Sequence, residues 1–235
     1  THDPILKERL FGLTGPQGNH GEDVKELYYF LDALPSHAYL RMLYKYPQRA
    51  FPYDVLLEGG RSRGTAEPEL ELGDTGIFDD HRYFDVTVEY AKATPDDILM
   101  QVHVTNRGPE AAPLVVVPQV WFRNTWSWGR EPARPELRTR GMDSLDLTHP
   151  LLGEFVLRGD APDEIAVCEN ETNHRRLYGI ETPGYFKDGV NDYVVHGDRG
   201  AINPEGRGTK AGLVWRRTVA AGAEMTIRLR LTRDA

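Results

Sequence analysis

Strict alternation of apolar and polar residues is the feature that most constrains how this chain can fold. In the run 84–90 every second residue is apolar, and the run 98–105 repeats the pattern after a turn-forming stretch at 94–97. The same alternation returns at 225–231. Successive side chains of a strand point to opposite faces, so a period of two predicts strands with one buried face and one solvated face.

The spread of turn-forming residues extends this prediction to the whole chain. The 23 glycines and 16 prolines are distributed over all 235 residues, as is typical of short strands joined by frequent turns. The run 114–122 is apolar on both faces and predicts a core strand, which Pro118 interrupts as a bulge or an edge. Without interleaved helices, the pattern predicts an all-β fold, a large antiparallel super-β-sandwich with few short helices. We expect residues 1–235 to form a single domain.

Two segments near the start are less regular. Residues 24–31 fit one face of a helix, but their aromatic residues, and those of 39–46, favour strands. We therefore expect a hairpin that turns at 34–36. The run 52–61 is the best candidate for a helix, because it ends at two glycines that could stop it.

Composition excludes several classes of protein. The net charge is −8 and no basic stripe is present, which argues against a nucleic-acid partner. The sequence has no uninterrupted run of about 18 apolar residues, so no membrane span is predicted. The start of the sequence lacks the basic and apolar regions of a secretion signal. A single cysteine, Cys168, is expected to be a small buried residue, and with no signal it favours the cytoplasm. Because the chain begins at Thr1 without methionine, we expect a processed product or a piece of a longer protein.

Signatures of catalysis or metal binding are weak. The polar run 18–23 holds His20, Glu22 and Asp23, but two histidines at the spacing of a zinc helix are absent, so no metal site is predicted. Glycines at 12, 15, 18 and 21 are not followed by the lysine of a phosphate loop. Paired carboxylates, such as Asp79 with Asp80, are sequence neighbours, which rarely face each other across a sugar, so a structural role is favoured over a catalytic pair.

The most informative segment is 120–129, which holds three of the four tryptophans beside an arginine and an asparagine. Sugars have an apolar face and a rim of hydroxyls, so aromatic platforms beside planar hydrogen-bonding side chains are typical of their binding sites. The alternative is structural: Trp121 and Phe122 would pack in the core, while Trp126 and Trp128 would fix a loop.

Several long strings of the sequence, which together span nearly the whole chain, carry a resemblance to a known family. They are residues 3–13, 18–26, 43–48, 78–85, 121–129, 169–173 and 191–197. In these strings the sequence resembles bacterial members of glycoside hydrolase family 63, the mannosyl-oligosaccharide-glucosidase-like group.

This resemblance implies the N-terminal β-sandwich of a two-part enzyme, whose α/α barrel holds the catalytic carboxylates and lies beyond this chain. No catalytic residue can therefore be assigned here. The family hydrolyses α-glucosidic bonds with inversion, on carbohydrate substrates, and needs no organic cofactor. Residues expected to line the sugar pocket or the domain interface are Arg123, Asn124, Trp126 and Trp128, with His20, Glu22 and Asp23 behind them.

Three functional hypotheses remain open at this point. The first is a non-catalytic sandwich that supports the barrel of an inverting α-glycosidase and lines part of its pocket, and it predicts an exposed apolar patch for docking. The second is a free-standing carbohydrate-binding module that uses the loop of Trp126 and Trp128. The third is a complete small hydrolase that uses Asp79 and Asp80, or the glutamates Glu169 and Glu171.

Overall fold

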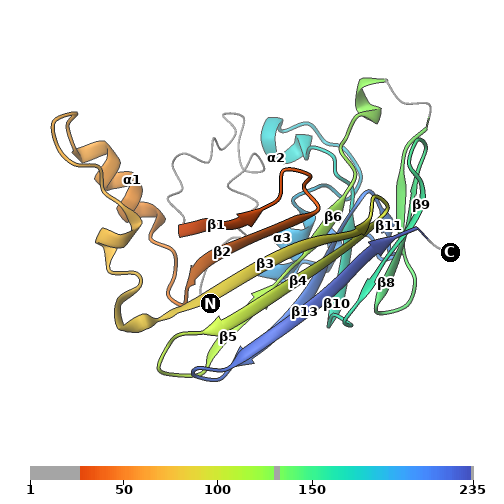
Figure 1. The fold of residues 1–235 in the computed structure, drawn as a ribbon. Coiled ribbons are helices and arrows are strands. Elements are labelled where there is room, and N and C mark those ends of the chain that lie inside the picture. Colours follow the sequence, from red (N-terminus) through yellow and green to blue (C-terminus); the bar gives the residue numbers. More distant parts are fainter. Residues whose placement is uncertain (1–26, 130–132, 234–235) are drawn as a thin grey trace.

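The computed structural model describes residues 27–129 and 133–233, which form two antiparallel sheets with three short helices (Figure 1). The larger sheet has nine strands. In spatial order they are β1 (Leu27–Ala33), β2 (Tyr39–Pro47), β3 (Tyr83–Thr94), β4 (Asp97–Asn106), β13 (Glu224–Thr232), β9 (Gly153–Gly159), β8 (Ser144–His149), β7 (Glu136–Thr139) and β11 (Arg207–Gly208).

The smaller sheet has four strands and is centred on one long strand. This strand, β12 (Lys210–Val219), pairs with β10 (Glu164–Cys168) on one side and with both β5 (Ala112–Val116) and β6 (Gln119–Trp121) on the other. The helices are α1 (Tyr53–Ser62), α2 (His174–Tyr178) and α3 (Gly189–His196). The predicted all-β class, with antiparallel sheets and few short helices, is therefore confirmed.

The hairpin and the helix predicted near the start of the chain are confirmed, but α1 continues to Ser62, so the predicted stop at Gly59 and Gly60 is wrong. β1 and β2 form the expected hairpin, and the amide of Leu34 donates to the carbonyl of Tyr39 at 3.0 Å across its turn. The helical alternative is wrong for residues 27–31, because their aromatic side chains extend a pleated sheet instead of covering one helix face. Figure 1 shows α1 at one end of the molecule, beyond β1 and β2.

The main core lies between the two sheets. Phe84 and Val104 on the larger sheet and Leu213 on the smaller one are completely or almost completely buried in it. Phe84 and Val104 are apolar members of the alternating runs, so the period of two fixes which face of β3 and β4 is buried. On the other face of the larger sheet, Asp97 in β4 pairs with Arg230 in β13, whose hydrogen bond lowers the pKa of this carboxyl.

Pro118 interrupts the apolar run 114–122, as expected. The run forms two short strands, β5 and β6, on either side of residues 117–118, and both strands pair with β12. The carbonyl of Pro118 still accepts a hydrogen bond from the amide of Leu213 at 2.9 Å. A second, smaller core lies between this sheet and α3, where Cys168 is fully buried, as predicted.

The inner face of the larger sheet extends beyond the smaller sheet. Phe30 in β1 lies opposite Met42 in β2, and Met42 lies opposite Val88 in β3, whose side chain joins the core. Phe30 is nevertheless 81% exposed, and Tyr28 on the same face is 52% exposed. An exposed apolar patch, made of Phe30 and Tyr28, therefore lies on the hairpin. No helix in the described ranges is both long enough and apolar enough to span a bilayer.

Candidate functional site

The tryptophan-rich segment leaves the smaller sheet after β6 and folds into a 3-10 turn at Trp126–Trp128. The side-chain oxygen of Asn124 accepts a hydrogen bond from the amide of Ser127 at 3.2 Å and so holds the start of this turn. Gly129 ends the turn with a φ of 65°, in the left-handed region that glycine adopts without a steric penalty. The turn thus presents two indole rings at one end of the sandwich.

Four side chains meet at this turn, and we call them the Trp126 centre: Trp126, Arg134, Glu169 and Glu171. The indole Nε1 of Trp126 donates to Oε1 of Glu171 at 2.9 Å. The guanidinium of Arg134 lies 2.6 Å from Glu169 and 3.0 Å from Glu171, and its central carbon is 5.5 Å from the centre of the Trp126 ring. An aromatic platform is therefore fixed beside two carboxylates and one planar guanidinium.

The backbone around β10 positions the two glutamates. Glu169 follows β10 directly, and its amide donates to the carbonyl of Tyr185 at 2.9 Å. The carbonyl of Glu171 accepts from the amide of Lys187 at 3.0 Å. Thr209, next to β12, donates its hydroxyl to Glu169 at 2.7 Å. Residues 169–171 are thus held between β12 and the segment that leads into α3.

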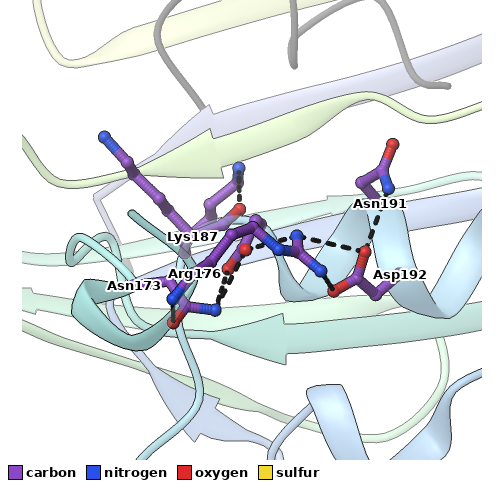
Figure 2. A network of polar contacts seen from close by, with 7 residues as sticks. Asn173, Arg176, Lys187, Asn191 and Asp192 are labelled. Carbon is purple, nitrogen blue, oxygen red and sulfur yellow. Dashed lines mark hydrogen bonds and ion pairs between the residues drawn. The ribbon is translucent and has the colours of Figure 1, made fainter. Parts of the chain in front are cut away.

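A polar network at the start of α3 secures this segment (Figure 2). Arg176 in α2 pairs with Asp188, whose side chain is 4% exposed, and with Asp192 in α3 at 2.7 Å. Asn173 accepts from the amide of Arg176 and donates to Asp188. Removing one partner of such a buried, hydrogen-bonded ion pair is costly, so the network ties α2 firmly to α3.

Two lysines lie next to this network. The Nζ of Lys210 donates to the carbonyl of Lys187 at 2.8 Å. Partial burial and the neighbouring charge of Lys210 lower the pKa of Lys187. The segment between the Trp126 centre and α3 therefore gathers several charged groups in a small volume.

A hollow of about 290 Å³ opens beside the Trp126 centre. Its walls include Arg134 and Glu169 from the centre itself, and Asn203, Arg207 and Thr209 from the chain around β11. Guanidinium and amide groups donate hydrogen bonds, while carboxylates accept them. The hollow can therefore bind a small polar molecule with many hydroxyls, and its wall residue Arg134 contacts the ring of Trp126.

The structure places the other predicted residues of this segment near the centre, in different roles. Arg123 lies over the ring of Trp128, with 5.6 Å between its guanidinium carbon and the ring centre, and Trp128 is 52% exposed. Asn124 holds the 3-10 turn. Phe122 packs against the core, but Trp121 is 57% exposed, so the structural alternative, in which both pack in the core, is wrong for Trp121. The two are strand neighbours, and only one of them can point inward.

The remaining candidates do not join this centre in the described part of the chain. His20, Glu22 and Asp23 lie outside the described residues. Asp79 and Asp80 lie in a 3-10 turn, where Asp80 is 3.6 Å from Arg49. Within residues 27–129 and 133–233, no three His, Cys, Asp or Glu side chains are grouped so that they could hold a metal ion.

Sequence reasoning missed Arg134, which joins both glutamates to the tryptophan. No local pattern marks this residue, because its partners lie 35 and 37 positions further along the chain. The grouping depends on how β10, β12 and the tryptophan turn meet in the fold.

Comparisons with known proteins give one strong match in sequence. No known family model matches the chain. The uncharacterized protein YMR196W of Saccharomyces cerevisiae is 37% identical over 270 aligned positions, which include 99% of this chain and 25% of the yeast protein. The chain thus spans about a quarter of the length of this curated relative.

Among solved structures, the galactose mutarotase related enzyme from Lactobacillus acidophilus matches with a TM-score of 0.42 and 10% identity. The match covers 88% of this chain and 71% of that one.

Proposed function

We propose that this chain is the non-catalytic N-terminal sandwich of an inverting α-glycosidase of glycoside hydrolase family 63. In this role it supports an α/α barrel of the same protein and lends the Trp126 centre to the wall of the sugar pocket. The observation that carries the proposal is the centre itself, because an indole, a guanidinium and two carboxylates meet beside a hollow of about 290 Å³. This combination suits a pyranose, which is apolar on its faces and polar on its rim.

Two further observations support a role inside a larger enzyme. The chain matches only a quarter of the yeast protein, so a related protein has room for a barrel outside the matched part. The apolar patch around Phe30 and Tyr28 would be covered by such a barrel, since exposed apolar patches often mark interfaces. The carboxylates that perform hydrolysis would then lie in the barrel, and this chain would supply binding and support.

The role of the centre can be tested in the longer protein by replacing Trp126 with alanine. We expect KM for small α-glucosides to rise about tenfold or more, because a lost sugar platform removes on the order of 1.4 kcal/mol of binding. The kcat should change little, since the reacting groups lie elsewhere.

The matched control is Trp121→Ala, because Trp121 is an exposed tryptophan of the same segment and lies outside the Trp126 centre. Its kinetics should match those of the natural enzyme. An unchanged KM in Trp126→Ala would mean that the Trp126 centre is not part of the sugar pocket. Sugar binding by the chain together with an inactive longer protein would favour a carbohydrate-binding module instead.

A further inference from the structure

Two polar hollows share one residue on the surface next to the Trp126 centre. The first is the hollow of about 290 Å³ described above, and the second, of about 350 Å³, lies over β7, β8 and β9. Glu136, the first residue of β7, lines both of them. The two hollows are therefore neighbours, joined at Glu136.

The register of the strands shows that both hollows lie on the same face of the sheet. Leu137 is fully buried, so its neighbours Glu136 and Arg138 in β7 point to the opposite, solvated face. Arg138 lies opposite Arg207 of β11, which lines the first hollow, and opposite Asp146 of β8, which lines the second. A continuous polar surface thus runs from the Trp126 centre across the outer face of β7 and β8.

The charges along this surface are mixed. Arg138 lies 3.1 Å from Glu136, and Arg140 lies 3.5 Å from Asp146. Arg207 and Arg134 in the first hollow are likewise paired with glutamates. Paired charges of both signs attract a polyanion weakly, but they offer many donors and acceptors to a neutral ligand rich in hydroxyls.

The sizes of the hollows favour an extended ligand. Ligand pockets usually measure about 300 to 1,000 Å³, so each hollow alone is near the small end of that range. A ligand that bridges Glu136 would use both hollows, and a linear chain of sugars has this shape and this chemistry.

We propose that a linear α-linked oligosaccharide binds across both hollows, with one sugar at the Trp126 centre and further sugars over β7 and β8. This inference rests on the proposed function, because it takes the Trp126 centre as a sugar contact. Arg138 then determines how strongly the length of the oligosaccharide affects binding, while Arg134 contributes to the binding of short and long sugars alike.

Titration calorimetry of the 235-residue chain with maltose and with maltohexaose tests this inference. We expect maltohexaose to bind about tenfold more tightly than maltose, which is what one or two added hydrogen bonds supply. Arg138→Ala should remove this gain and leave maltose binding unchanged, whereas Arg134→Ala should weaken the binding of both sugars. The matched control is Arg41→Ala, an exposed arginine of β2 near the other end of the same sheet.

Three results would overturn the inference: equal affinity for the two sugars, a gain for maltohexaose that survives in Arg138→Ala, or no binding of either sugar. The first two would still leave a sugar contact at the Trp126 centre. Absence of binding would not by itself remove the proposed function, since that is decided by turnover in the longer protein. Failure of the two proposals can therefore be distinguished.

Discussion

Asn106, at the end of β4, is fully buried and uses all of its side-chain hydrogen-bonding capacity. Its Nδ2 donates to the carbonyls of Glu110 and Val219, each at 2.8 Å. Its Oδ1 accepts from the amide of Gly108 at 2.8 Å and from Nε2 of Gln48 at 2.6 Å. One side chain therefore joins the turn after β4 to the residue that follows β2 and to the end of β12.

Replacing Asn106 with aspartate should destabilise the fold strongly. The new oxygen would face two carbonyl oxygens where an amide now donates, and a charge would be buried without a partner. We expect the free energy of unfolding in urea to fall by about 3 kcal/mol or more.

Asn124→Asp is the matched control, because its side-chain oxygen only accepts from Ser127 and aspartate can do the same. A change within about 0.5 kcal/mol is expected there. If Asn106→Asp lowered the free energy of unfolding by less than about 1 kcal/mol, the prediction would be wrong, because the buried amide would then contribute little to stability.

At the candidate site, the sequence indicates the right residue types but only part of the grouping. The tryptophans beside Arg123 and Asn124 stand out because they are neighbours in sequence. Glu169 and Glu171 appear in the sequence only as a polar cluster, and Arg134 has no local signal at all. The Trp126 centre forms through contacts between distant segments, which a pattern of neighbours does not contain.

At the scale of elements, the position of α3 depends on Gly189, the first residue of this helix. A Cβ on Gly189 would lie 2.1 Å from the carbonyl oxygen of Ala201, so the 3-10 turn at Arg199–Ala201 packs directly on the start of the helix. Gly189→Ala should therefore displace α3 and lower the free energy of unfolding by about 2 kcal/mol. Urea unfolding followed by tryptophan fluorescence measures this change.

Gly60→Ala in α1 is the matched control, because nothing lies within 4 Å of the added Cβ and the backbone is helical. Alanine favours a helix over glycine, so this variant should gain up to about 1 kcal/mol. If both substitutions changed the free energy of unfolding equally, the contact with Ala201 would not determine the position of α3.

Clear alternation makes β3, β4 and β13 predictable from this sequence, and an apolar run indicates β5 and β6, but the central strand β12 has no such signal. β3, β4 and β13 alternate clearly and appear where the pattern predicts them. The first six residues of β12 are all buried, because the larger sheet covers one face and α3 covers the other. Burial on both faces removes the period of two, so β12 shows no alternation in sequence.

At the scale of the whole molecule, the described residues resemble one part of a larger assembly. The inner face of the larger sheet leaves Phe30 and Tyr28 exposed, and the chain corresponds to a quarter of its yeast relative. Both observations fit a sandwich that packs against a catalytic barrel, as we propose.

Release of free glucose from small α-glucosides, measured side by side for the 235-residue chain and for the longer protein, tests this claim most directly. The proposed function predicts turnover by the longer protein and none by the chain alone. Turnover by the chain alone would contradict it, and Asp79, Asp80, Glu169 and Glu171 would then be the first residues to replace. An inactive longer protein would contradict the assignment to an α-glycosidase.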